Sequence, residues 1–383
     1  MESLSGLEMT LSDVAALARV QRPVVSMWRS RSAGSALPFP GPVTTDRGRD
    51  VFSASEIATW LEATGRGNNP TAAADLSAYA SPGTDRTGDR SRFEALTALL
   101  VLRVLNGRAL AGLSSGELLD AADDADPNDR FLYKELEHAA DALPELAAYA
   151  DSLADAAYNP AAAFETLMAA RFRSGLRDLA DVALTAVALD LVAGAAVELA
   201  RQLGTDMFAD ASRGGSDLLL GVADGTADPD RMTVLIANDD GGASRLARRR
   251  LRVRGIDATA LPSAADGSLR VERPVVHLAQ YPSAGWPGMG PEEILAAVGQ
   301  TDLQMDDAQR AVVLAPARVL CGPLTGRNGG GGGAARLRAD LLRGGRVRAI
   351  IRLPAGLLRS RPREQQALWI LGPSFAEVEI ADR

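Results

Sequence analysis

With 383 residues, the chain is long enough for two or three domains, and its 46% hydrophobic and 23% charged content is typical of an ordinary globular protein. One cysteine excludes an intramolecular disulfide, and Cys321, His138 and His277 are too few for a Cys- or His-rich metal site, so we predict no metal. The formal net charge of -8 argues against indiscriminate binding of nucleic acid, although clustered arginines can still bind phosphate locally.

The amino-acid composition and the N-terminal sequence indicate the type of genome and the cellular location of the protein. Ala, Gly and Arg are abundant and Lys134 is the only lysine, a bias typical of bacterial genes with high GC content. The N-terminus lacks the basic and then apolar pattern of a signal peptide, and Asp190, Glu198 and Arg201 interrupt the most apolar predicted helix. We therefore expect a cytoplasmic protein without a membrane partner.

Residues 11–31 are predicted to form two short helices joined by a tight turn at Val20. Ser12 or Asp13 can cap the first helix, and Pro23 suits the first position of the second. This pattern predicts a small helical unit at the start of the chain.

The second of these helices has an inner and an outer side. Val25 and Trp28 share the inner side, which leaves four polar side chains outside: Arg22, Ser26, Arg29 and Arg31. The segment resembles the helix-turn-helix of excisionase-like bacterial DNA-binding domains, with Arg19 at a turn position where glycine is common. The resemblance implies that the outer side chains contact base edges and phosphates of double-stranded DNA.

The following segment, residues 38–52, is rich in Pro and Gly and is predicted to form a hairpin wing from which Arg47 or Arg49 can contact the DNA backbone. Ser53 and Glu56 fit a capping box for a third helix. We therefore predict a winged helix-turn-helix DNA-binding domain in residues 1–66. The alternative is a small helical adaptor without DNA contact.

A linker and a helical bundle are predicted next. Residues 67–90 lack apolar periodicity and are rich in small and polar residues, which indicates a flexible linker. Apolar residues return at helical spacing in residues 91–180, which predicts a helical bundle. The bundle also contains a group of acidic residues that is most simply solvated surface: Asp123, Asp124, Asp126 and Asp129. They do not form an EF-hand, because the glycine and the terminal glutamate that this motif requires are not at the right spacing.

Residues 181–383 read as alternating strands and helices, with small or acidic residues where strands end. A strand at 207–209 leads into Asp210, Gly214 and Gly215, and glycines after a parallel strand let a ligand approach the backbone. The next strand ends in Asn238-Asp239, and a later turn contains Asp266. An acidic group at such a position can accept hydrogen bonds from both hydroxyls of a ribose.

This order of strand ends resembles the cofactor half of S-adenosylmethionine-dependent methyltransferases, specifically the adenine-N6 DNA methyltransferases related to modification subunits of type I restriction systems. In that family the first loop reads Asp-Pro-x-x-Gly-x-Gly; Asp210 and Gly214 match, whereas Ala211 replaces the proline and Ser216 the last glycine. The resemblance implies S-adenosylmethionine as the cofactor and an α/β fold, a Rossmann-like methyltransferase sheet preceded by the helical bundle and the winged helix-turn-helix.

The resemblance assigns two further cofactor positions. The family's helix before the first strand starts with Thr-Pro near the methionine end of the cofactor, and Thr185 matches while Ala186 replaces the proline. Family alignment places Asn238 at the ribose position, whereas a shift by one residue places Asp239 there. An amide cannot accept from both hydroxyls as a carboxylate can, so cofactor affinity depends on which residue lies there.

The family's catalytic loop reads Asn/Asp/Ser-Pro-Pro-Tyr/Phe, in which the first side chain binds the adenine amino group and the ring stacks on a flipped base. The corresponding residues here are Gln280, Tyr281, Pro282 and Ser283, of which only Pro282 matches cleanly. Tyr281 or Trp286 could supply the missing ring. We therefore expect weak or lost catalysis, and the alternative function is an inactive DNA-binding regulator or defence-system subunit on a methyltransferase scaffold.

Arginine clusters and the end of the chain bear on partners. Residues 241–256 contain six arginines without an acid, and residues 336–363 contain nine arginines and Asp340. Solvated helix faces are the simplest interpretation of most of them. Because no long region after Arg383 is present for target recognition, three alternatives are open: the winged domain supplies recognition, a partner such as a specificity subunit does, or the chain is truncated after Arg383.

Overall fold

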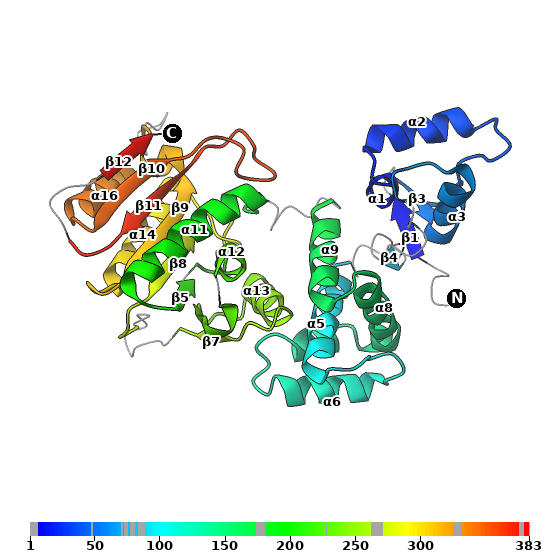
Figure 1. The fold of residues 1–383 in the computed structure, drawn as a ribbon, viewed down its shortest axis with the longest axis horizontal. Coiled ribbons are helices and arrows are strands. Elements are labelled where there is room, and N and C mark those ends of the chain that lie inside the picture. Colours follow the sequence, from blue (N-terminus) through cyan, green and yellow to red (C-terminus); the bar gives the residue numbers. More distant parts are fainter. Residues whose placement is uncertain are drawn as a thin grey trace. The chain divides into compact units, whose positions relative to one another are not determined.

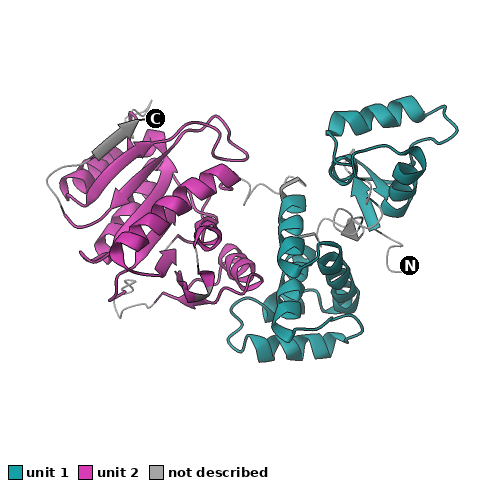
Figure 2. Ribbon diagram, viewed as in Figure 1, with its two compact units in different colours: residues 1–175 teal, residues 176–383 magenta. Residues whose placement is uncertain are grey.

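The computed structural model describes residues 7–46, 49–69, 72, 76, 81–82, 89–173, 181–210, 212–226, 228–261, 271–324, 331–374 and 379–382. The chain divides into two compact units, residues 1–175 and 176–383 (Figure 2). Within the described ranges, no helix has both the length and the apolar character needed to cross a membrane.

The first unit begins with a small sheet and three helices. The helices are α1 (Leu11–Leu17), α2 (Arg22–Ser32) and α3 (Ala54–Thr64). The strands are β1 (Leu7–Thr10), β2 (Pro42–Asp46), β3 (Arg49–Ser53) and β4 (Ser81–Pro82), in the antiparallel order β2-β3-β1-β4. The two helices, the turn and the β2–β3 hairpin lie where they were predicted, whereas β1 was not predicted. That this arrangement is a DNA-binding domain stays a prediction.

Two predicted helix caps are wrong. Thr10 caps α1: its hydroxyl accepts from the Asp13 N–H at 3.3 Å, while Asp13 accepts from the Thr10 N–H at 3.0 Å. Ser53 does precede α3, but within the described residues its hydroxyl makes no cap bond and lies 3.0 Å from the Ser55 hydroxyl. Arg19, in the turn after α1, has a φ of 52°, which explains why glycine suits this position.

Part of the predicted linker packs against the turn after α1. The Asn68 N–H donates to the carbonyl oxygen of Ala18 at 2.8 Å, and the Asn69 side chain donates to that of Leu17 at 2.8 Å. Strand β4 pairs with β1, although most of its neighbours lie outside the described residues. Residues beyond 66 therefore still contact the segment that contains α1 and the turn after it.

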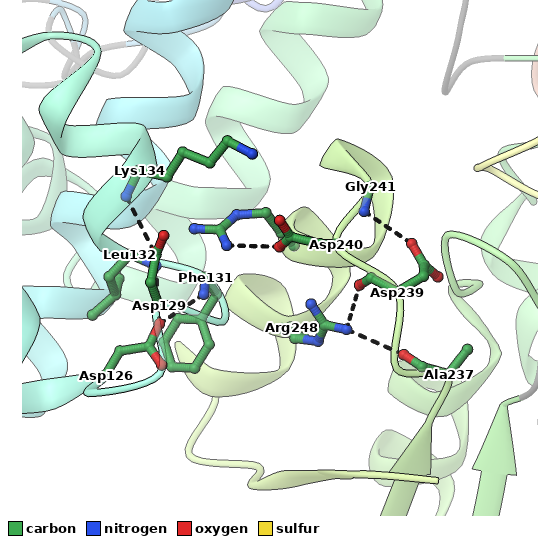
Figure 3. A network of polar contacts seen from close by, with 11 residues as sticks. Asp126, Asp129, Phe131, Leu132, Lys134, Ala237, Asp239, Asp240, Gly241 and Arg248 are labelled. Carbon is green, nitrogen blue, oxygen red and sulfur yellow. Dashed lines mark hydrogen bonds and ion pairs between the residues drawn. The ribbon is translucent and has the colours of Figure 1, made fainter. Parts of the chain in front are cut away.

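The rest of the first unit is the predicted helical bundle. Its helices are α5 (Asp89–Asn106), α6 (Ser115–Ala125), α7 (Tyr133–Glu137), α8 (Leu143–Ala156) and α9 (Pro160–Arg173), with a 3-10 turn at Ala140–Ala142. Asp126 was expected on a solvated face, but it is buried and accepts from the N–H groups of Phe131 at 2.7 Å and Leu132 at 3.1 Å (Figure 3). Its role is to hold the loop before α7, because buried carboxylates need hydrogen-bond donors.

The second unit is built around a mostly parallel sheet. Its strands are β5 (Met207–Asp210), β6 (Thr233–Ile236), β7 (Ala258–Ala260), β8 (Val276–Gln280), β9 (Arg310–Pro316), β10 (Val347–Arg352), β11 (Gln366–Leu371) and β12 (Glu379–Asp382). Their order is β12-β10-β11-β9-β8-β5-β6-β7, and β11 runs antiparallel to both neighbours. This confirms the predicted α/β class, although residues 366–372 were expected to form the last strand and β12 follows them.

Helices cover both faces of this sheet (Figure 1). They are α11 (Ala186–Leu203), α12 (Leu218–Gly225), α13 (Gly242–Arg252), α14 (Pro291–Gln304), α15 (Ala317–Leu320) and α16 (Gly331–Arg343), with a 3-10 turn at Pro229–Arg231. Alternate strand residues enter different cores: Val312 and Leu314 pack with α11 and α12, whereas Val313 packs with α14. Burial on both faces explains the continuous apolar runs of β8 and β9.

Candidate functional site

The candidate site lies at the carboxyl edge of the sheet, where β5, β6 and β8 end. Asp210 pairs in register with Ile236 of β6 and Leu278 of β8, and all three strands are parallel. The loops that follow them therefore leave the sheet from one edge. This is the edge at which open parallel sheets bind ligands.

Asp210 organises the loop after β5. Its side chain is 0% exposed, and its carboxylate accepts from the Ser212 N–H at 2.9 Å and from the Ser216 hydroxyl at 2.5 Å. Burial raises the pKa of the Asp210 carboxyl above its usual value, while these hydrogen bonds lower it. Ser216, in place of the family's last glycine, thus closes the loop through its side chain.

The two glycines of this loop adopt backbone conformations that favour glycine. Gly214 has a φ of 83° and Gly215 a φ of 67°. A Cβ atom on Gly214 would lie 2.2 Å from the backbone nitrogen of Gly285, and the Gly285 N–H donates to the carbonyl oxygen of Arg213 at 2.9 Å. The space over Gly214 is therefore filled by the loop after β8.

Asp239 holds the loop after β6. Its carboxylate accepts from the N–H of Gly241 at 3.0 Å (Figure 3), from the Ser244 hydroxyl at 2.5 Å and from the N–H of Gly214 at 3.4 Å. Of the two candidate ribose ligands, Asp239 is thus the one beside the glycine loop, and Asn238 is exposed. Three donors from its own chain already share this carboxylate, which has about four acceptor positions.

A pocket lies between these two loops. Its free space, open solvent included, is about 270 Å³. Its lining consists of Asp210, Gly215, Ser216, Leu219, Ile236, Ala237, Ser244, Ala247 and Leu251. Small-molecule sites usually start at about 300 Å³. Asp210 and Gly215, two of the predicted cofactor residues, are part of this lining.

The predicted catalytic side chains turn inward. The Gln280 amide donates to the carbonyl oxygen of Val182, and its backbone N–H donates to the Ser212 hydroxyl at 3.2 Å. Tyr281 is 6% exposed, and burial raises the pKa of its hydroxyl to about 12. Ser283 is 2% exposed. None of these three side chains presents a face on which a base could stack.

Trp286 is the aromatic side chain of this loop that reaches solvent. After Pro282 the chain makes a tight turn, in which Ser283 pairs with Trp286 and the Trp286 N–H donates to the Ser283 carbonyl oxygen at 3.1 Å. The Trp286 side chain is 42% exposed. The turn therefore places an exposed ring next to the position where the family has its aromatic residue.

Two further residues were predicted to bind the cofactor, Thr185 and Asp266, and the structure describes only Thr185. Thr185 caps α11: its hydroxyl accepts from the Ala188 N–H at 3.4 Å, and its own N–H donates to the Leu357 carbonyl oxygen at 2.9 Å. Because Gln280 donates to Val182, the start of α11 lies at the same edge as the β8 loop. Asp266 lies outside the described residues. Among those described, no group of three or more acidic, His or Cys side chains could hold a metal ion.

The predicted DNA-binding residues divide into exposed and engaged side chains. Arg22, Ser26 and Arg31 on α2 are exposed. Arg29 instead forms an ion pair of 2.6 Å with Asp50 of β3, and its guanidinium lies over the Phe52 ring. The hydrogen bond from Arg29 lowers the pKa of the Asp50 carboxyl. Arg47 and the side chain of Arg49 lie outside the described residues.

Sequence reasoning missed two residues that shape the site. Ser244 was not predicted because a serine early in a helix rarely signals a partner five residues upstream. Gly285 was not predicted because its contact with Arg213 and Gly214 joins segments about 70 residues apart. The glycine preceding Trp286 is a weak signal of close backbone approach.

No family model and no curated protein matches the sequence. Among solved structures, the methyltransferase subunit of the type I restriction-modification system from Streptococcus thermophilus is 17% identical, covers 86% of this chain and 75% of its own, and has a TM-score of 0.45. The M protein of the type I restriction enzyme EcoKI is 16% identical, with coverages of 75% and 65% and a TM-score of 0.37.

A protein of Listeria monocytogenes assigned to the class I S-adenosylmethionine-dependent methyltransferases is also similar. It is 14% identical and covers 77% of this chain and 93% of its own, with a TM-score of 0.44.

Proposed function

We propose that this chain is a DNA-binding protein with a methyltransferase-like domain that does not transfer methyl groups to adenine. The observation that carries the proposal is the inward orientation of the loop after β8. The amide nitrogen of Gln280 is bonded to Val182, and Ser283 is buried where the family has an exposed ring. The two groups at the family's base-binding positions are thus engaged in the protein's own packing, which argues against positioning adenine for transfer.

The N-terminal helices support the DNA-binding half of the proposal. Helix α2 buries Val25 and leaves Arg22, Ser26 and Arg31 exposed. These side chains can donate to phosphates and to base edges in the major groove of double-stranded DNA. The hairpin β2–β3 is tied to α2 by the pair of Arg29 and Asp50, as a wing next to a recognition helix would be.

The test combines two measurements on the full chain. Fluorescence anisotropy with double-stranded DNA should show binding that weakens with salt. Incubation with labelled S-adenosylmethionine and mixed genomic DNA should leave adenine unlabelled. Labelled N6-methyladenine would overturn the loss of catalysis, and absence of binding at low salt would overturn the DNA-binding half.

A second candidate is an active adenine-N6 DNA methyltransferase that uses S-adenosylmethionine. This candidate is favoured because four predicted cofactor residues lie at one edge of the sheet: Asp210, Gly214, Gly215 and Asp239. For this function, the cofactor must bind beside the glycine loop, where Gly285 lies over Gly214.

Calorimetric titration with S-adenosylmethionine separates the two candidates before any DNA is added. A clean absence of heat removes the enzyme, whereas binding keeps it. The triple change Gln280→Asn, Tyr281→Pro and Ser283→Phe then shows whether the scaffold is otherwise competent, because it restores the family loop. As a subunit, the chain would act with a specificity or other defence-system partner, which the resemblance implies.

A further inference from the structure

A buried histidine lies at the amino edge of the large sheet, opposite the edge that carries the candidate site. His277 is the second residue of β8, and its side chain is 3% exposed. In the sheet it pairs in register with Ala209 of β5 and Ala311 of β9. The candidate site lies where these strands end, so the residues of that site do not explain a histidine near the start of β8.

Gln309 determines which ring nitrogen of His277 carries a proton. The Gln309 amide nitrogen donates to the carbonyl oxygen of Val271 and, at 3.2 Å, to that of Arg273. Because carbonyl oxygens only accept, the atom of Gln309 that faces His277 Nε2, 2.9 Å away, is the amide oxygen. An amide oxygen also only accepts, so the hydrogen of the neutral imidazole is on Nε2 and the lone pair is on Nδ1.

The second ring nitrogen of His277, Nδ1, is buried. It has no hydrogen-bond partner among the residues that the structure describes. A proton on Nδ1 would create a buried N–H without an acceptor among these residues and a buried positive charge, and both are costly. Burial accordingly lowers the pKa of His277 below its usual value, whereas the bond to Gln309 and the negative charge of Asp306 raise it.

The charged groups near the start of β8 are engaged with other partners. Asp306 accepts from the Ala308 N–H at 2.8 Å, and Arg346 lies 3.7 Å from Asp302 and 3.3 Å from Asp307. Arg310 donates to the carbonyl oxygens of Asp307 and Gln309. The charged residues on the adjoining segments are Asp206 before β5, Glu272 and Arg273 before β8, Asp302 in α14, Asp306, Asp307 and Arg310 around the start of β9, and Arg346 before β10. Within the described ranges, none of their carboxylates accepts a hydrogen bond from the His277 ring.

Through Gln309, His277 is connected to the segment that leads into β8. The carbonyl oxygens of residues 271 and 273 accept from Gln309. Residues 274 and 275 have attachments of their own, because their carbonyl oxygens accept from the Thr205 hydroxyl at 2.8 Å and from the Arg310 N–H at 3.1 Å. A change in the orientation of the Gln309 amide should therefore affect residues 271–273 before it affects the rest of the sheet.

We propose that the His277–Gln309 pair is a pH-sensitive switch that releases residues 271–273 when His277 takes up a proton from solvent. With both ring nitrogens protonated, the imidazolium has to turn toward an acceptor, and Gln309 then loses the bond that orients its amide toward the two carbonyl oxygens. Residues 271–273 connect the predicted cofactor residue Asp266 with β8 along the sequence. The inference is independent of the proposed function, since neither DNA nor cofactor takes part in it.

The proton position can be tested directly, because the chain contains only two histidines, His138 and His277. Nitrogen NMR of the full chain with labelled histidine shows which ring nitrogen carries hydrogen, and the spectrum of the His138→Gln protein assigns the remaining signal to His277. At neutral pH this signal should show a proton on Nε2 and none on Nδ1. A proton on Nδ1 would overturn the proposal, because the Gln309 amide would then have the opposite orientation.

Hydrogen exchange followed by mass spectrometry tests the release. After opening, His277 titrates near its ordinary value of 6.5, whereas its pKa in the closed state is lower, so opening becomes more favourable as the pH falls below 6.5. One proton linked to opening increases the open population by up to about tenfold between pH 7.5 and 5.5. Protection of the amides in residues 271–273, corrected for the pH dependence of intrinsic exchange, should fall by this factor. Residues 310–316 of β9 should keep their protection in the same samples, and an equal loss there would mean unfolding of the whole unit and overturn the switch.

Two variants separate His277 from other titrating groups. His277→Gln keeps a donor for the Gln309 oxygen but cannot take up a proton in this pH range, so its protection over residues 271–273 should not change. His138→Gln is the matched control, since His138 is exposed in the first unit, and its decline should equal that of the unchanged protein. An equal decline in the His277→Gln protein would overturn the proposal. So would the absence of a decline in the unchanged protein, a result that does not depend on how well any variant folds.

Discussion

At the carboxyl edge of the large sheet, the loops after β5 and β6 differ from the loop after β8 in how closely their residues follow the sequence pattern of the methyltransferases that the chain resembles. The loops after β5 and β6 bring the predicted cofactor residues Asp210, Gly214 and Asp239 together at this edge. The loop after β8 buries Tyr281 and Ser283, which the resemblance assigns to the base. Cofactor recognition and base positioning depend on different loops, so the first can be kept where the second is lost.

The two regions also constrain each other. Gly285 of the β8 loop fills the space over Gly214, and Asp239 accepts the Gly214 N–H. The β8 loop thus packs on the loop that is predicted to hold the cofactor. Substitutions at this contact therefore test whether the cofactor half is still a binding site or only a scaffold.

Gly214→Ala should have the largest effect on stability. Its φ of 83° strains any other residue, and the new Cβ would lie 2.2 Å from the Gly285 nitrogen. Strain and overpacking together should lower the free energy of unfolding by about 3 kcal/mol, measured by urea denaturation.

Gly194→Ala is the matched control for that substitution. Gly194 lies within α11, and a Cβ atom at this position would meet nothing within 4 Å among the neighbours described. Alanine should therefore raise the free energy of unfolding by about 0.5 to 1 kcal/mol, because it favours the helix more than glycine does. If Gly214→Ala is as stable as the unchanged protein, the β8 loop is free to leave the glycine loop, and the two regions are not coupled.

Asp210→Asn should have the next largest effect. The buried carboxylate accepts from the Ser212 N–H and the Ser216 hydroxyl, and the amide leaves one of these donors without an acceptor. The expected loss is about 2 kcal/mol in the free energy of unfolding. Ser216→Ala is the milder companion variant, because it removes one donor and leaves the carboxylate in place.

The pH dependence of the free energy of unfolding, compared between the unchanged protein and the Asp210→Asn protein, tests the direction of the pKa shift of Asp210. Burial raises the folded-state pKa of Asp210 above its ordinary value of 3.8. The folded chain then binds more protons than the unfolded chain between the two values, so its contribution to stability is present below pH 3.8 and is lost as the pH rises through the folded pKa. The asparagine variant should lack this decline, and a parallel decline in both proteins would contradict the shift.

Several parts of the site could be predicted from the sequence because they depend on neighbours along the chain. Apolar runs ending in Asp210 or Asn238 locate strand ends, since a buried parallel strand must be apolar and must stop at a polar residue. Positions 214 and 215 could be predicted for the same reason: the turn after a strand needs left-handed backbone, which glycine adopts.

Other parts depend on contacts between distant segments and could not be predicted. Whether Asn238 or Asp239 faces the glycine loop depends on how the chain turns after β6, and periodicity does not specify that turn. The contact of Gly285 with Arg213 and the pairing of β1 with β3 join residues far apart in the chain. The cap of α1 was missed for a more local reason, because Thr10 supplies the hydroxyl ahead of both predicted capping residues.

Gly285→Ala should have a smaller effect on stability and the clearest effect on ligand binding. The new Cβ would lie 2.7 Å from the Arg213 carbonyl oxygen, so the β8 loop should shift outward at a cost of about 1 kcal/mol. If this loop only blocks a competent cofactor site, the variant should bind S-adenosylmethionine more tightly than the unchanged protein in calorimetry. Absence of binding in both proteins would mean that the β5 and β6 loops are scaffold only.

The smallest effect is expected on α2, where the same contrast between engaged and exposed side chains recurs. Arg29 is held by Asp50 and by the Phe52 ring, whereas Arg31 is exposed two residues later. Arg29→Ala should therefore lower Tm slightly, because surface pairs contribute little, while Arg31→Ala should leave Tm unchanged.

Binding to double-stranded DNA separates the two arginines further. A guanine-edge contact by Arg31 would cost about 1 to 3 kcal/mol at one base position, whereas a phosphate contact would weaken binding uniformly and reduce its salt dependence. Asp50→Ala frees Arg29 without removing it, so this variant should bind DNA at least as tightly as the unchanged protein. If the Arg29→Ala, Arg31→Ala double variant binds DNA with the affinity of the unchanged protein, neither arginine contacts DNA. Helix α2 would then not be the element that reads DNA.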